Sequence, residues 1–157
     1  MVSLWGTAWG NILMTFLISM VPVIELRGAI PAAVLAGLDI RIALITAIIG
    51  NLVPVPFIII FIRKIFKWLQ AKSQWLGNMV RRLEAKADAK KAQVLKYEFW
   101  GLMILVAIPL PGTGAWTGAL VAALMDLRLK SAVPSIFCGV LLASVIVTCI
   151  VLGLFSL

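Results

Sequence analysis

Two ionisable residues, Glu25 and Arg27, directly follow the uncharged stretch Met1–Ile24. An ionisable group inside a bilayer costs at least ~2.5 kcal/mol on insertion scales, so such a residue is a functional candidate by default. In that role Glu25 would bind a coupling proton or a sodium ion, and Arg27 would hold an anionic group such as a phosphate or a carboxylate. The alternative is structural: the two charges neutralise each other, or they lie near the membrane surface if this first turn is shallow.

A second group of residues points to anion binding. The segment Pro109–Gly114 holds two prolines and two glycines in six positions, so a continuous helix through it is not expected. The amides of Gly112, Thr113 and Gly114 would then open the next helix, whose positive end favours an anion. A turn that needs glycine only for steric reasons explains the same residues equally well.

Further candidate residues lie near these two groups. Asn51 stands among Gly50, Pro54 and Pro56 at a predicted helix kink, where it either lines the site or bonds the backbone. Trp116 is close enough to the second turn to line a site, or it anchors the chain at the membrane surface. The prolines assigned to the predicted turns are Pro22, Pro31, Pro109 and Pro111.

The composition is that of a membrane protein. Of the 157 residues 63% are hydrophobic and 13% are charged, and the mean hydropathy is +1.13. Soluble domains are nearer half apolar and a quarter charged, so a soluble globular protein, a disordered chain and a nucleic-acid-binding domain are excluded. The chain has no histidine, which excludes imidazole chemistry and His-ligated metal sites. Because no Ser/His, paired-Asp or metal-ligand pattern is present, an enzyme and a bound metal or cofactor are not expected.

Positive charge is concentrated in one segment. The net charge is +8, and residues 63–98 carry ten Lys or Arg residues and three acidic ones. The positive-inside rule places this segment in the cytoplasm. We expect an amphipathic helix around 78–96 that lies on anionic lipids of the inner leaflet, although an acidic partner protein or a solvated linker fits about as well. Nucleic acid is not expected as a partner.

The uncharged stretches favour two spans and two hairpins over four spans. Residues without charge fill the stretches 1–24, 42–62, 99–125 and 131–157. A span needs about 20 apolar residues, but the pieces on either side of Pro109–Gly114 would each rise only ~15–17 Å, about half a bilayer. The piece after Arg27, residues 28–38, is equally short. Both places are therefore predicted to be re-entrant helical hairpins.

An internal repeat supports the two hairpins. A shift of 87 positions aligns residues 22–41 with residues 109–128 without a gap and with six identities. The identical pairs include Asp39 and Asp126, each predicted to cap the long helix that follows it. A hairpin crosses the membrane zero times and the following helix crosses once. The second copy must therefore be inverted, as in many secondary transporters.

The predicted fold is an all-α integral membrane protein with two inverted repeats, each a re-entrant helical hairpin followed by one transmembrane helix. Residues 1–157 form a single membrane domain, with 1–62 as the first repeat, 63–98 as the basic connector and 99–157 as the second repeat. In the plasma or inner membrane both termini would lie outside, whereas four full spans would put both in the cytoplasm. Because two hairpins and two spans bury little core alone, a homo-oligomer such as a dimer is expected.

Three sequence runs carry a resemblance: Glu25–Pro31, Gly50–Pro56 and Pro109–Gly118. Through them the chain resembles the small multidrug export family of bacterial and archaeal membrane proteins. It is more distantly similar to DedA-type membrane proteins, whose paired re-entrant hairpins are implicated in moving lipid phosphates between leaflets. The DedA pattern has an arginine around its second Pro-Gly turn, whereas the corresponding turn here has no charge.

The residues and the resemblance together predict a small ion-coupled transporter or flippase for an amphipathic or anionic substrate, lipid-phosphate or drug-like. Arg27 and the amides of Gly112–Gly114 would grip one ligand at the midplane, with Trp116 and Asn51 beside it and Glu25 as the ion-coupling residue. Membrane lipids are the expected partners. Two alternatives are a four-helix multidrug exporter of dual topology, which the charged connector disfavours, and a non-transporting scaffold or assembly protein.

Overall fold

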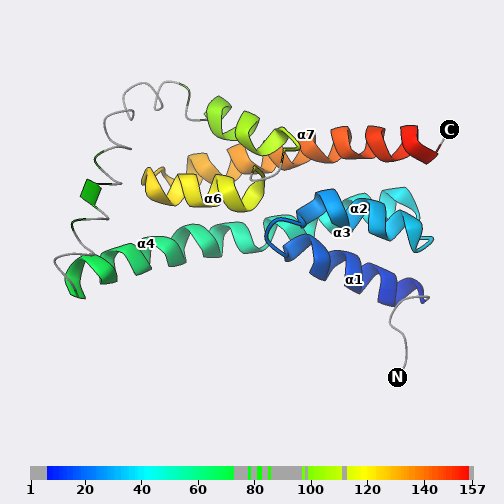
Figure 1. Cartoon of the computed structure of the whole chain (residues 1–157), viewed down its shortest axis with the longest axis horizontal. Coiled ribbons are helices and arrows are strands. Elements are labelled where there is room, and N and C mark those ends of the chain that lie inside the picture. The colour runs from blue at the N-terminus through cyan, green and yellow to red at the C-terminus, as the bar shows by residue number, and fades with distance from the viewer. Residues whose placement is uncertain are drawn as a thin grey trace.

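The described part of the chain folds into helices joined by short turns. The computed structural model describes residues 7–72, 78, 81, 82, 85, 97, 99–110 and 113–155. Its helices, in chain order, are α1 (Ala8–Met20), α2 (Glu25–Leu35), α3 (Ile40–Leu52), α4 (Pro54–Lys72), α6 (Ala115–Leu124) and α7 (Leu129–Phe155) (Figure 1). Residues 99–107 are also helical. The prediction of an all-helical protein is confirmed, while the amphipathic helix expected around 78–96 lies largely outside the described residues.

Two helical stretches are long and apolar enough to cross a bilayer. Ile40–Ile65, in α3 and α4, has 26 residues, and Leu129–Gly153, in α7, has 25. At 1.5 Å per residue each rises about 37–39 Å, more than the ~30 Å of a hydrocarbon core. By contrast α1, α2 and α6 have 13, 11 and 10 residues and rise only ~15–20 Å each. These short helices cannot each cross a bilayer.

The short helices pack against the long ones. The α1–α2 hairpin packs on α3, and α6 packs along α4 (Figure 1). Helix α7 contacts both groups, because it packs against α2 and α3 as well as against α4 and α6. The fully buried side chains of Leu26, Ile30, Ile59 and Ile136 fill the core between these elements. One apolar core therefore joins the two halves of the chain.

Each long helix has a glycine where a short helix crosses it closely. A Cβ atom added to Gly50 in α3 would lie 2.6 Å from the carbonyl oxygen of Phe16 in α1. A Cβ atom on Gly139 in α7 would lie 2.7 Å from the carbonyl oxygen of Met103, in the helical residues 99–107. Small residues allow backbones to approach in this way in membrane helix packing. The two glycines therefore allow the backbones to approach closely at these crossings.

The structure corrects one of the four turn prolines. Pro22 lies in the turn 21–24 between α1 and α2, and Pro109 lies in the non-helical segment after residue 107. The assignment of Pro31 to a turn is wrong, because Pro31 lies inside α2. Its ring removes only the amide that would bond the carbonyl of Arg27, and the helix continues past it. Pro111 lies outside the described residues.

The two aspartates before the long helices behave differently. Asp39 caps α3 as predicted, because its side chain accepts a hydrogen bond from the backbone amide of Arg41 at 2.9 Å. The cap predicted for Asp126 is wrong, since α7 begins three residues later, at Leu129. Asp126 has a φ of 50° in the preceding loop, and its carboxylate pairs with Arg63 at 3.4 Å. This ion pair ties α4 to the loop between α6 and α7.

Candidate functional site

Helix ends from both halves of the chain meet near the middle of the molecule (Figure 1). The end of α1 and the beginning of α6 are joined by a hydrogen bond from Nε1 of Trp116 to the carbonyl oxygen of Met20, at 3.2 Å. Glu25, which begins α2, and Asn51, near the end of α3, are 2% and 0% exposed. These helix ends, with polar side chains buried between them, form the candidate site.

The carboxylate of Glu25 caps the beginning of α6. Its Oε1 accepts a hydrogen bond from the backbone amide of Trp116 at 3.1 Å, and its Oε2 accepts one from that of Ala115 at 3.4 Å. The first amides of a helix have no partner within the helix and carry partial positive charge, so they stabilise a carboxylate. Glu25 itself has a φ of 49°, a conformation that costs about 1–3 kcal/mol in a residue other than glycine. The surrounding contacts hold it there.

The guanidinium of Arg27 binds the end of the helical residues 99–107 and the turn that follows. Its acceptors are the carbonyl oxygens of Leu110 (2.5 Å), Ile108 (2.9 Å), Thr113 (3.2 Å) and Val106 (3.4 Å), and the hydroxyl oxygen of Thr113 (3.0 Å). Carbonyls at a helix end lack helical donors and carry partial negative charge. Glu25 and Arg27 therefore hold opposite sides of the break in the second hairpin.

The structure brings most of the predicted site residues together, in an arrangement that differs from the predicted one. The residues that meet here are Glu25, Arg27, Asn51, Thr113, Gly114 and Trp116. The amides at the start of α6 face Glu25, whereas Arg27 faces carbonyl groups. Gly112 lies outside the described residues. The sequence did not predict that Arg27 bonds the carbonyls of Ile108 and Leu110. The only sign of these carbonyls in the sequence is the Pro-Gly segment, which interrupts the helix.

Gly114 is expected to tolerate no side chain. Its φ is 124°, and a Cβ atom there would lie 2.1 Å from Oε2 of Glu25. Gly114→Ala should therefore lower the stability by about 2–4 kcal/mol, measured as a lower melting temperature in detergent. The matched control is Gly101→Ala, because a Cβ atom at Gly101 meets nothing within 4 Å. Equal melting temperatures for the two variants would contradict the contact with Glu25.

Asn51 is buried next to the carboxylate of Glu25. Neither its amide nitrogen nor its amide oxygen has a hydrogen-bond partner of ordinary geometry. Two prolines follow it: Pro54 has no amide hydrogen for the carbonyl of Gly50, and Pro56 has none for that of Leu52. At the junction of α3 and α4, the amide oxygen of Asn51 therefore lies near a buried carboxylate, in a stretch where two helical donors are absent.

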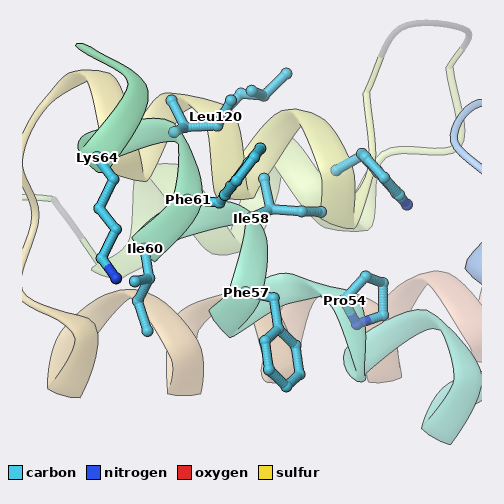
Figure 2. Close-up of a pocket in the computed structure, with 9 residues that line it drawn as sticks. Pro54, Phe57, Ile58, Ile60, Phe61, Lys64 and Leu120 are labelled. Carbon is cyan, nitrogen blue, oxygen red and sulfur yellow. The ribbon is translucent and has the colours of Figure 1, made fainter. Parts of the chain in front are cut away.

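An apolar groove of about 690 Å³ lies between α4 and α6, the α4–α6 groove. Its lining side chains are Pro54, Phe57, Ile58, Ile60, Phe61, Ile62, Lys64, Trp116 and Leu120. Figure 2 shows Leu120 above Phe61 and Ile58, with Lys64 and Pro54 toward opposite ends of the groove. The groove opens outward, because the side chain of Phe61 is 63% exposed. Trp116 connects it to the site, since the backbone amide of Trp116 bonds Glu25.

Comparison with known proteins decides the family. Residues 25–146 match the family model described as "Putative small multi-drug export protein". The chain belongs to this family. Comparison with curated proteins and with solved structures gives no match. The matched region of this family member begins at Glu25 and includes the groove and the candidate site apart from the end of α1.

The family and the helices agree on the class of protein. The family description names export, which points to a transporter rather than an enzyme. Two helices long and apolar enough to span a bilayer agree with this, so this family member is an all-helical membrane protein. The family description and the two long apolar helices thus agree with the membrane protein predicted from composition.

Proposed function

We propose that this protein is a small ion-coupled exporter that accepts amphipathic substrates in the α4–α6 groove. The observation that carries the proposal is the position of Trp116, whose side chain lines the groove while its backbone amide bonds the buried carboxylate of Glu25. A substrate in the groove would contact Trp116, and Trp116 is hydrogen-bonded to Glu25, the proposed coupling group. In this proposal Arg27 and Thr113 keep the second turn in shape beside the groove.

The lining of the groove supports a largely apolar substrate with one polar end. Eight of the nine lining residues are apolar or aromatic, and the remaining one, Lys64, is cationic. Pockets of this volume and composition suit small organic ligands, with the few polar groups fixing orientation. The neighbouring Arg63 is engaged with Asp126 and with the carbonyl of Leu127. Lys64 is therefore the groove's candidate contact for an anionic or polar head group.

The proposal includes two inverted repeats in the membrane. In Figure 1 the α3–α4 stretch and α7 run in opposite directions, and the beginning of α1 lies at the same end of the molecule as the end of α7. The end of α4 lies at the opposite end, and the two hairpin turns lie between these ends. Hairpins that enter from opposite leaflets and meet near the midplane would have this arrangement. The helices of the hairpins are also too short to cross.

Matching helix bounds support the repeat. The first residues of α3 and α7, Ile40 and Leu129, are 89 positions apart, and so are the last residues of α2 and α6, Leu35 and Leu124. The crossing glycines, Gly50 and Gly139, differ by the same number. Before the turns the matching shift is 87. The carbonyls that approach the two glycines belong to Phe16 and Met103, which are 87 positions apart. Between these matched points the second half of the chain therefore has two more residues than the first.

Reciprocal contacts between the halves give further support. Trp116 lies 89 positions after Arg27, and each side chain donates to carbonyl groups at the turn of the other hairpin. Arg27 bonds the carbonyls of Val106 and Ile108, and Trp116 bonds that of Met20. If a two-fold axis relates the two halves, each contact from the first half to the second has an equivalent contact in the other direction, as found here.

Filling the groove is expected to block export. Leu120→Trp would place an indole in the groove, whereas Leu142→Trp is a matched control on α7, because Leu142 is similarly exposed (44% against 38%) and does not line the groove. In everted vesicles, export from the cell appears as uptake into the vesicle, and we expect this uptake of ethidium and of a fluorescent dodecyl phosphate to fall at least tenfold in Leu120→Trp only. Export unchanged by both variants would remove the groove from the transport path. No export of either probe by the unmodified protein would contradict the proposed function.

A further inference from the structure

We propose that Glu25 and Asn51, together with the carbonyl groups of Gly50 and Leu52, form a sodium-ion site at the junction of α3 and α4. This inference rests on the proposed function only for its role, which is to supply the coupling ion. The existence of the site rests on the buried oxygen atoms and can be tested without transport.

The charge of Glu25 is incompletely balanced. Arg27 attracts this carboxylate electrostatically, but its guanidinium is directed at the carbonyls of the second turn and makes no direct ion pair with Glu25. The start of α6 offers only about half an elementary charge. A carboxylate has about four lone-pair sites, and the amides of Ala115 and Trp116 use two of them. Negative charge and acceptor capacity thus remain available for a cation.

Asn51 supplies the independent observation. It is fully buried, and neither polar atom of its side chain has a hydrogen-bond partner of ordinary geometry, although the side chain lies close enough to interact with the carboxylate of Glu25. Buried amides are nearly always satisfied, and an unsatisfied one calls for an explanation such as an ion or a water molecule. An ion bound between the amide oxygen of Asn51 and the carboxylate of Glu25 would satisfy both groups. Asn51 therefore marks where the ion would lie.

The helix junction can complete the oxygen shell. Helix α3 ends at Leu52 and α4 begins at Pro54, and Pro54 and Pro56 leave the carbonyls of Gly50 and Leu52 without their helical donors. Broken helices that offer freed carbonyls to Na⁺ near the midplane are the usual arrangement in transporters with inverted repeats. Binding a proton would need only one carboxylate oxygen. The unused amide and carbonyl oxygens therefore favour a metal cation over a proton.

Thermal unfolding of the purified full-length protein in detergent tests the site. At constant ionic strength, NaCl should raise the melting temperature by on the order of 5 °C with a saturable dependence on concentration. KCl and choline chloride should not. Binding of radioactive ²²Na⁺ should reach one ion per chain. Equal stabilisation by all three salts, or no ²²Na⁺ binding, would overturn the proposal.

Two variants and a control assign the ligands. Asn51→Val introduces the residue type found 89 positions later, at Val140, which is also buried. It should fold and lose the Na⁺-dependent shift. Glu25→Gln, a near-isosteric change, should lose it as well. The control is Ser144→Ala, another buried polar residue, whose hydroxyl bonds only its own helix at Leu141. A Na⁺-dependent shift that survives both site variants would overturn the assignment.

The transport assay separates this inference from the proposed function. Export that depends on a pH gradient and is indifferent to Na⁺ would remove the sodium site and leave the exporter standing. Saturable ²²Na⁺ binding that requires Asn51, in a protein that exports neither probe, would establish the site and remove the proposed function.

Discussion

Arg27→Leu should unfold the second turn and with it much of the protein. The substitution removes the donor to the carbonyls of Val106, Ile108, Leu110 and Thr113. The carbonyls of Ile108 and Leu110 would keep only donors from within the turn itself. Carbonyl groups that lose a charged donor away from water cost several kcal/mol together, so we expect a loss of about 4 kcal/mol or more. The measurement is the melting temperature and the yield of monodisperse protein in detergent.

The control for this prediction is Arg41→Leu. Arg41 is an exposed arginine at the start of α3, so its replacement changes the net charge equally and leaves the turn alone. Arg27→Lys should recover only part of the stability, because a lysine ammonium keeps the charge but lacks the planar fork that reaches several carbonyls at once. Should Arg27→Leu melt like the unmodified protein and lose only export of anionic probes, Arg27 would be a substrate ligand rather than a support of the turn.

The two possible roles of Arg27 show which features of the site can be predicted from the sequence alone. The break at Pro109–Gly114 and the charged pair before α2 were visible in residue types, because proline, glycine and membrane charges are rare and physically distinctive. The partners of Arg27 were not visible, because every residue carries a carbonyl group and only the folded chain shows which ones lack a donor. Glu25 was therefore identified correctly as buried, at 2% exposure, without its contact to α6.

The groove was missed for a related reason. Phe57, Phe61 and Leu120 are ordinary apolar residues of membrane helices. No spacing in the sequence separates a residue that faces a groove from one that faces lipid. The hollow arises from the way α6 lies along α4 (Figure 2), which is a consequence of tertiary packing.

In the proposed repeat, the sequence alignment is two residues out of step after the turn. The alignment at a shift of 87 paired Asp39 with Asp126, yet in the structure Asp126 has the left-handed conformation that Gly37 adopts, with φ values of 50° and 81°. The helix bounds after the turn match at a shift of 89. In an alanine-rich sequence chance identities are frequent, so a two-residue insertion in a turn leaves little trace. Backbone conformation and helix bounds carry the information that identities lack.

The second large effect concerns topology. In a chain lacking the native cysteines Cys138 and Cys149, a cysteine introduced at Thr7 or at Leu157 should react with an impermeant maleimide added to intact cells. A cysteine at Ala85, in the basic segment, should react only after permeabilisation. The reason is the number of crossings: a hairpin contributes none and the long helix one, so each half ends on the opposite side from where it began.

The labelling outcome divides the two topologies completely. Four full spans would put Thr7, Ala85 and Leu157 on one side, because each half would then cross twice. The short helices, at ~15–20 Å each, argue against that arrangement, and so does the separation of the end of α4 from the end of α7 in Figure 1. Labelling of all three positions under the same conditions would contradict the inverted repeats. It would also remove the proposed midplane position of the contact between Glu25 and the start of α6, because both hairpins would become crossings.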